Sequence, residues 1–181
     1  MPPYIPYTPY TLIPFPPIPP FTMETISILG FGNPVREDDG VGIYVIEQLN
    51  KELSAPHIEI LDMGTSAFEV LFKLQGRDKI ILIDAVVNTG EPVGTLFRLP
   101  AEEVEGQIED DPLVFLHGLK WHQALSYARK MLQDEYPKDV EVFLIAVDHT
   151  RFDLNISAEA QAGADRLVKL LLEELQTTAS L

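Results

Sequence analysis

The chain has 181 residues, enough for one domain with a sizeable hydrophobic core. Its 28 Asp and Glu residues outnumber 13 Lys and Arg, and the resulting net charge of −15 disfavours nucleic acid and anionic membrane surfaces as partners. The absence of cysteine excludes disulfides, thiolate metal ligands and a cysteine nucleophile, so any metal must bind oxygen and imidazole ligands. We expect a cytoplasmic monomer.

Residues 1–22 differ in composition from the rest of the chain. They hold nine of the fifteen prolines and no Asp, Glu, Lys or Arg. Repeated proline excludes an ordinary helix or a transmembrane helix, and the segment lacks the basic start of a signal peptide. We predict a disordered or extended, polyproline-like tail, with Met23 as an alternative or the true start and residues 23–181 as a single α/β domain. A proline-rich ligand for a partner protein is the alternative.

The first predicted strand covers residues 26–29 and runs into the glycine turn Gly30-Phe31-Gly32. An apolar-periodic segment from Val41 to Leu53 then predicts a helix. The chain therefore opens with the first half of a βαβ unit.

This glycine turn is also the start of a dinucleotide-binding pattern, because Gly30 and Gly32 supply its first two glycines. Val35 stands where the third glycine belongs, and Pro34 removes a backbone donor. The acids at positions 37–39 would repel a pyrophosphate at the helix N-terminus. We therefore predict that the turn binds a cation rather than a nucleotide.

Strands and helices alternate along the rest of the chain. Predicted strands cover residues 57–61, 79–83, 94–99 (an edge strand) and 140–147, and predicted helices cover residues 66–76, 119–132 and 157–175. Ser66, with Glu69 three residues later, has the spacing of a capping box. Residues 100–112 are rich in acids and predict a solvated helix and loop. The order predicts a three-layer α/β sandwich, with a mostly parallel twisted sheet and helices on both faces, as in phosphorylase/hydrolase-like folds.

Three predicted strands lead to acids at the carboxyl edge of the sheet, where open α/β folds place their ligand sites. The first leads to Asp38 and Asp39, the second ends at Asp62, and the third ends at Asp84. Asp38 and Asp62 are equally explained as caps of the helix and the turn that follow them. Asp84 lies between apolar residues, and a buried carboxylate needs a hydrogen bond, an ion pair or a metal.

The chain has four histidines. His117 precedes a glycine at the start of a predicted helix, where a loop would bring it over the sheet edge, and His149 follows the last strand as a second choice of ligand. His57 precedes the second strand at its amino end, and His122 is expected on a helix face. Two carboxylates and one imidazole suit nickel or zinc, with coordination positions left open.

Four motifs in this order resemble the nickel-iron hydrogenase maturation endopeptidases, over about residues 26–175. They are Gly30-Phe31-Gly32-Asn33 with Asp38-Asp39-Gly40-Val41-Gly42, Leu61-Asp62-Met63-Gly64-Thr65, Ile83-Asp84-Ala85, and His117 before a helix.

The resemblance implies an endopeptidase that removes a C-terminal extension from the hydrogenase large-subunit precursor after nickel insertion. It implies that Asp39, Asp84 and His117 contact the metal. Nickel is then carried by the substrate, although zinc or another divalent ion is expected to occupy the same site in vitro.

The resemblance also assigns roles to the other motif residues. It implies that Asp62, Gly64 and Thr65 line the cleft. We expect Asp38 to contact the substrate or support a metal ligand, and either Asp62 or Asp38 to act as general base.

Two other functions remain open at this point. Peptidyl-tRNA hydrolases share a Gly-x-Gly-Asn-Pro opening, although the acids at 38 and 39 and the net charge oppose tRNA docking. A metal-dependent chaperone that holds the immature subunit would use the same three ligands. In addition, residues 147–152 differ from the Pro-containing turn of many members of the resembled family, so the cleft wall there is expected to differ.

Overall fold

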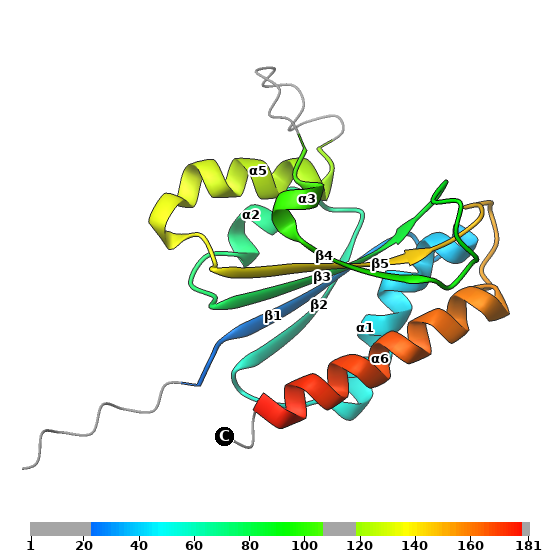
Figure 1. Ribbon diagram of the computed structural model, residues 1–181, viewed down its shortest axis with the longest axis horizontal. Helices are drawn as coiled ribbons and strands as arrows, with labels where there is room; N and C mark the ends of the chain where they lie inside the picture. Colours follow the sequence, from blue (N-terminus) through cyan, green and yellow to red (C-terminus); the bar gives the residue numbers. More distant parts are fainter. Residues whose placement is uncertain (1–22, 107–118, 179–181) are drawn as a thin grey trace, which may run out of the picture.

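A five-stranded sheet with helices on both faces forms the centre of the protein (Figure 1). The computed structural model describes residues 23–106 and 119–178. Strand order is β2-β1-β3-β5-β4. The four parallel strands are β1 (Ile26–Phe31), β2 (Ile58–Gly64), β3 (Lys79–Val86) and β5 (Asp139–Ala146), and the antiparallel edge strand is β4 (Leu96–Pro100).

The helices form two layers, one on each face of the sheet (Figure 1). One face packs against α1 (Val41–Glu52) and α6 (Ala158–Thr178). The other packs against α2 (Val70–Lys73), α3 (Ala101–Val104) and α5 (Trp121–Leu132). Two short 3-10 turns, η1 (Glu37–Gly40) and η2 (Gln133–Glu135), lie before α1 and after α5. The predicted three-layer α/β sandwich with a mostly parallel sheet and an edge strand near residue 96 is confirmed.

The middle of the sheet is apolar on both sides, because its strands are covered by both helix layers. Residues 80–83 of β3 are all at most 1% exposed, and alternate residues belong to the two separate cores. Continuous apolar runs are typical of strands buried on both faces. In the parts of the chain that the structure describes, none of the helices has the length and apolarity needed to cross a membrane.

Two predicted strands ended too early, and one predicted helix start was wrong. β2 and β3 continue past Asp62 and Asp84, because pairing with β1 and β5 extends the ladders to Gly64 and Val86. Ser66 begins no helix: its N–H donates to the Met63 carbonyl in a turn, and α2 starts only at Val70, with no side-chain cap. Tertiary contacts thus outweighed the local capping pattern.

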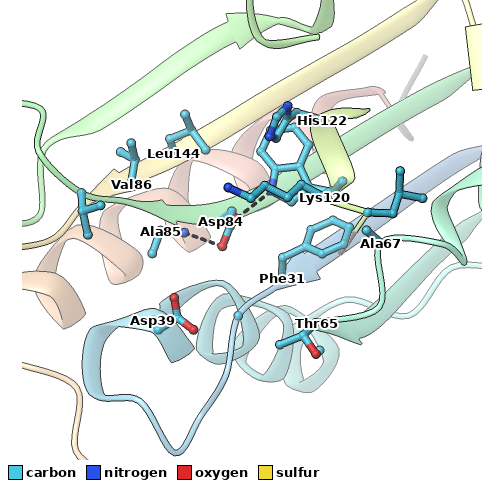
Figure 2. Close-up of a pocket in the computed structure, with 15 residues that line it drawn as sticks. Phe31, Asp39, Thr65, Ala67, Asp84, Ala85, Val86, Lys120, His122 and Leu144 are labelled. Atoms are coloured by element: carbon cyan, nitrogen blue, oxygen red, sulfur yellow. Dashed lines mark hydrogen bonds between the residues drawn. The ribbon is translucent and has the colours of Figure 1, made fainter. Parts of the chain in front are cut away.

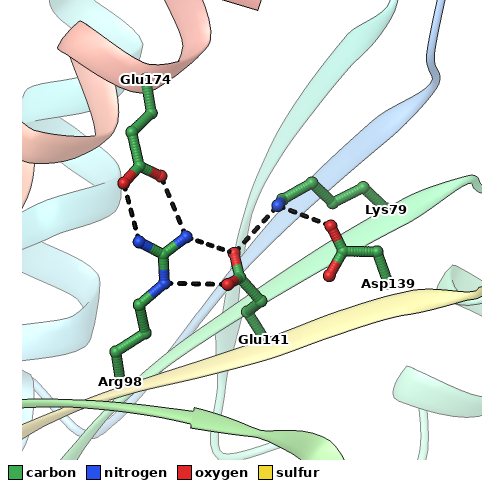
Figure 3. A network of polar contacts seen from close by, with 5 residues as sticks. All are labelled: Lys79, Arg98, Asp139, Glu141 and Glu174. Carbon is green, nitrogen blue, oxygen red and sulfur yellow. Dashed lines mark hydrogen bonds and ion pairs between the residues drawn. The ribbon is translucent and has the colours of Figure 1, made fainter.

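A network of five charged side chains links β3, β4, β5 and α6 (Figure 3). Its members are Lys79, Arg98, Asp139, Glu141 and Glu174. Glu141 Oε1 accepts a hydrogen bond from Arg98 Nε at 2.8 Å, and Glu141 Oε2 accepts one from Arg98 Nη2 at 3.0 Å and lies 2.9 Å from Lys79 Nζ. Burial raises the pKa of Glu141, but the bonds from Arg98 and Lys79 outweigh it and hold the pKa below its usual value. The carboxylate therefore stabilises the folded state.

We predict that Glu141→Gln lowers stability at pH 7 by about 1.5–3 kcal/mol, the range for hydrogen bonds to charged groups. Because the pKa of Glu141 is lower in the folded protein, its contribution is complete above the unfolded pKa, near 4.5, and is lost as the pH falls through the folded pKa. Urea unfolding at pH 7 and at pH 3 should therefore show a smaller difference between variant and wild type at the lower pH. A difference that is equal at both values would contradict this.

Candidate functional site

A cavity of about 600 Å³ opens at the carboxyl edge of the sheet, between the ends of β1 and β3. β1 pairs with β2 on one side and with β3 on the other, so the connections after β1 and β3 leave in different directions. Pairing between β1 and β3 stops at Gly30 and Ile83, and the cavity occupies the space beyond. Ligand sites of open α/β sheets lie at such switch points.

Five segments contribute the lining of the cavity (Figure 2). The end of β1 and the turn after it contribute Phe31, Gly32 and Asp39, and the end of β2 with the residues after it contributes Gly64, Thr65 and Ala67. The end of β3 contributes residues 84–87, β5 contributes Leu144, and the start of α5 contributes residues 119–122. Two carboxylates, one lysine and one histidine thus share the cavity with a mainly apolar wall.

Asp39 reaches the cavity because the chain folds back after β1. Gly32 has φ 136°, and a side chain there would collide with the carbonyl of Asp39. The Asp39 Oδ2 accepts a hydrogen bond from the Asn33 N–H at 3.1 Å, which closes this turn. The glycine turn predicted from the sequence therefore places the Asp39 carboxylate at the cavity.

Asp84 stands on β3 at the centre of the lining (Figure 2). Its Oδ1 accepts from the Ala85 N–H at 2.8 Å, and its Oδ2 accepts from the Trp121 Nε1–H at 2.7 Å. The pKa of Asp84 is raised to about 6: burial raises it most, the hydrogen bonds from Trp121 and Ala85 oppose the rise, and the charge of Asp39 adds to it.

The residues of the second motif, at the end of β2, divide between the cavity and its border. Gly64 and Thr65 line the cavity, as the resemblance implied. Asp62 is exposed and is not among the lining residues. Its Oδ1 accepts a hydrogen bond from the Gly64 N–H at 2.8 Å, the turn-capping arrangement that the sequence left open, and Gly64 has φ 50°.

Asp38 lies away from the cavity. It is 2% exposed, and its carboxylate accepts hydrogen bonds from the N–H and the hydroxyl of Ser157 at 2.6 and 2.8 Å. The expectation that Asp38 caps the helix after Gly40 was wrong, because α1 has no side-chain cap and Asp38 instead anchors the segment that begins α6. Asp38 also does not line the cavity that a substrate would enter.

The three described histidines lie in different parts of the molecule. His117, the preferred ligand, lies outside the described residues. His149 lies on the β5–α6 connection, with its Nε2 3.5 Å from Glu37 Oε2, and does not line the cavity. His57 is at the amino end of β2, as predicted. His122 does line the cavity. Burial lowers the pKa of the His122 imidazole, and the positive charge of Lys120 lowers it further.

Sequence reasoning missed two features of the cavity. His122 was expected only on a helix face, and Trp121, which bonds Asp84, was given no role. Periodicity does not distinguish a residue at a helix start that faces a cleft from one that faces a core. Within residues 23–106 and 119–178, no three His, Asp or Glu side chains gather as a group able to hold a metal. The described residues thus supply Asp39 and Asp84, and the third predicted ligand lies beyond them.

Residues 43–174 match the family model described as hydrogenase maturation protease. The chain belongs to this family. It is 27% identical to the hydrogenase 2 maturation protease of Escherichia coli K12 over 157 residues, which cover 83% of this chain and 90% of the relative. A putative hydrogenase maturation protease of Methanocaldococcus jannaschii is 27% identical over 158 residues, covering 83% and 96%.

A solved structure has a similar fold. The hydrogenase maturating endopeptidase HybD of E. coli superposes with a TM-score of 0.71 at 26% identity, over 85% of this chain and 93% of that one. Membership of the hydrogenase maturation protease family confirms the resemblance predicted from the four motifs, and it makes the chain a peptidase.

We predict that Asp84→Asn makes the protein relatively more stable as the pH rises. The pKa of Asp84 is raised from 3.8 to about 6 on folding, so ionisation of the folded protein costs free energy that grows from about pH 4 to above pH 6. An asparagine avoids that cost, which is at most about 3 kcal/mol and is partly offset by altered hydrogen bonds. Urea unfolding of both proteins at pH 4, 5, 6 and 7, with a chelator present, measures the trend. A constant difference over this range would refute it.

Proposed function

We propose that this peptidase removes a C-terminal extension from the large-subunit precursor of a nickel-iron hydrogenase after nickel insertion, and that Asp39, Asp84 and His117 contact the nickel carried by the precursor. One observation carries the proposal: Asp39 and Asp84, on separate segments, line one cavity at the carboxyl edge of the sheet. The family supports hydrogenase precursor processing, and the two carboxylates support recognition of a cation.

The electrostatics of the cavity support a cation. Among the described residues, neither Asp39 nor Asp84 has an ion-pair partner within 4.0 Å. Each carboxylate oxygen has two lone pairs, so the hydrogen bonds to Asn33, Ala85 and Trp121 leave acceptor capacity on both groups. Two neighbouring carboxylates without a basic partner attract a divalent ion, and carboxylate with imidazole suits nickel.

Nickel is then a recognition element rather than a resident cofactor. A precursor that already carries nickel supplies the ion, and the ligands of this chain complete its coordination when the two proteins meet. The bound ion places the scissile peptide in the cavity, and it either polarises the scissile carbonyl or lowers the pKa of an attacking water. Zinc or another divalent ion is expected to bind the same ligands in vitro.

Of the two carboxylates considered as general base, Asp62 is better placed than Asp38. Asp62 is exposed at the end of β2, beside the lining residues Gly64 and Thr65. Asp38 is buried, and both of its oxygens are bonded to Ser157. We therefore assign proton transfer to Asp62 and the alignment of the peptide to Gly64 and Thr65.

We predict that Asp39→Asn, Asp84→Asn and His117→Ala each slow precursor cleavage by at least about 100-fold, the loss typical of removing a group that stabilises developing charge. Mass spectrometry of nickel-loaded precursor after incubation with each variant measures the rate, and circular dichroism verifies folding. Asp134→Asn is the matched control, because Asp134 is exposed on η2 and lines a different pocket.

The outcomes separate the alternatives. Folded variants that cleave at the wild-type rate would remove these residues from the proposed site. Equal cleavage of precursor with and without nickel by the wild type would refute nickel recognition while keeping the peptidase. A precursor left whole by the wild type in both conditions would favour a binding module.

A further inference from the structure

Trp121 is the contact that links Asp84 to the helix layer above the sheet. Its Nε1–H donates to Asp84 Oδ2 at 2.7 Å, across 37 positions of sequence. The other hydrogen bond of Asp84 comes from the N–H of the next residue, Ala85, and so belongs to β3 itself. The indole therefore makes the long-range bond that fixes the direction of this carboxylate.

The indole is itself held by its neighbours. Its ring lies 6.0 Å from the Phe31 ring, tilted by 31°, and 5.8 Å from the His122 ring, which meets it edge-on at 88°. His122 is packed closely against Gly106, whose N–H donates to the His122 carbonyl at 3.0 Å. A donor whose own ring is fixed by packing can orient its acceptor.

The start of α5 carries this arrangement. Trp121 is the first residue of α5, and the Lys120 N–H donates to Gln123 Oε1 at 3.1 Å, which stabilises the N-terminus of the helix. The position of the indole thus follows from the start of α5.

We propose that Trp121 is a positioning residue, which acts through its indole N–H to keep the Asp84 carboxylate directed into the cavity. The inference rests on the proposed function, in which Asp84 meets the nickel of the precursor. Without the N–H, Asp84 keeps only the bond to Ala85, and its carboxylate can rotate away from the cavity. An orienting partner of this kind typically changes metal affinity or activity by about 10–100-fold.

The chain has one tryptophan, which allows a sharp experiment. Trp121→Phe keeps an aromatic ring and loses the N–H. A second form replaces the tryptophan biosynthetically by its benzothiophene analogue, in which sulfur takes the place of the indole N–H in a ring of nearly the same shape. Because there is one site, only Trp121 changes, and the second form serves if Trp121→Phe does not fold.

Ser126→Ala is the matched control. It removes a buried hydrogen bond from the same helix, and Ser126 does not line the cavity. We expect it to lower stability by about 1 kcal/mol and to leave cleavage unchanged. It therefore measures what a merely structural loss in α5 does to the reaction.

We expect both Trp121 forms to lower the kcat/KM for cleavage of nickel-loaded precursor by about 10–100-fold, because Asp84 takes part in recognising the nickel. Crystal structures of both forms should show the Asp84 carboxylate turned from the cavity or in more than one orientation. Cleavage equal to that of Ser126→Ala, or an Asp84 carboxylate that stays in place, would overturn the inference.

The cleavage rate and the crystallographic orientation of Asp84 together separate this inference from the proposed function. If the wild type fails to cleave the precursor, the proposed function fails, and the position of Asp84 in the crystal structures decides the inference. If the wild type cleaves and Asp84 stays in place without the N–H, the inference fails alone.

Discussion

The N-terminal turn of α1 rests directly on the carboxyl ends of β1 and β3, with no side chain between them. A methyl group at Gly42 would collide with the carbonyl oxygens of Phe31 and Ile83, and one at Gly30 would collide with the Ile46 side chain. This close approach leaves little room for the connection between β1 and α1, which must therefore fold back as η1. Asp39 is placed beside the end of β3 as a result.

The same packing separates two adjacent acids. In η1, neighbouring side chains point in different directions, so Asp38 and Asp39 cannot both face the cavity. Asp38 turns inward and bonds Ser157 at the start of α6, which ties this turn to the far end of the chain. Asp39 remains at the cavity as an acceptor with spare capacity. One acid thus stabilises the loop, and the other lines the cavity.

The compensated charges of the sheet and the carboxylates of the cavity lie in different parts of the sheet. The network of Lys79, Arg98, Asp139, Glu141 and Glu174 compensates its charges with ion pairs and hydrogen bonds across β3, β4, β5 and α6. Asp84, in contrast, is half-buried beside another carboxylate, and its raised pKa records a cost to the folded protein. Groups with such costs cluster at functional sites.

The amino-acid sequence by itself determined the order of strands and helices, the three-layer fold and the family. Hydrophobic periodicity depends on local geometry, so the buried runs of β1, β3 and β5 were visible without coordinates. The acids at the ends of β1 and β3 could be predicted to converge, since parallel strands end at one edge.

Only the tertiary structure decided which side chains meet there. Asp38 pairs with Ser157 across 119 positions, and Asp84 with Trp121 across 37. These contacts depend on the register of the strands and on how closely α1 and α5 approach the sheet, neither of which leaves a periodic signal in the sequence. The local capping pattern at Ser66 failed for the same reason, because packing of α2 against α5 and the sheet outweighed it.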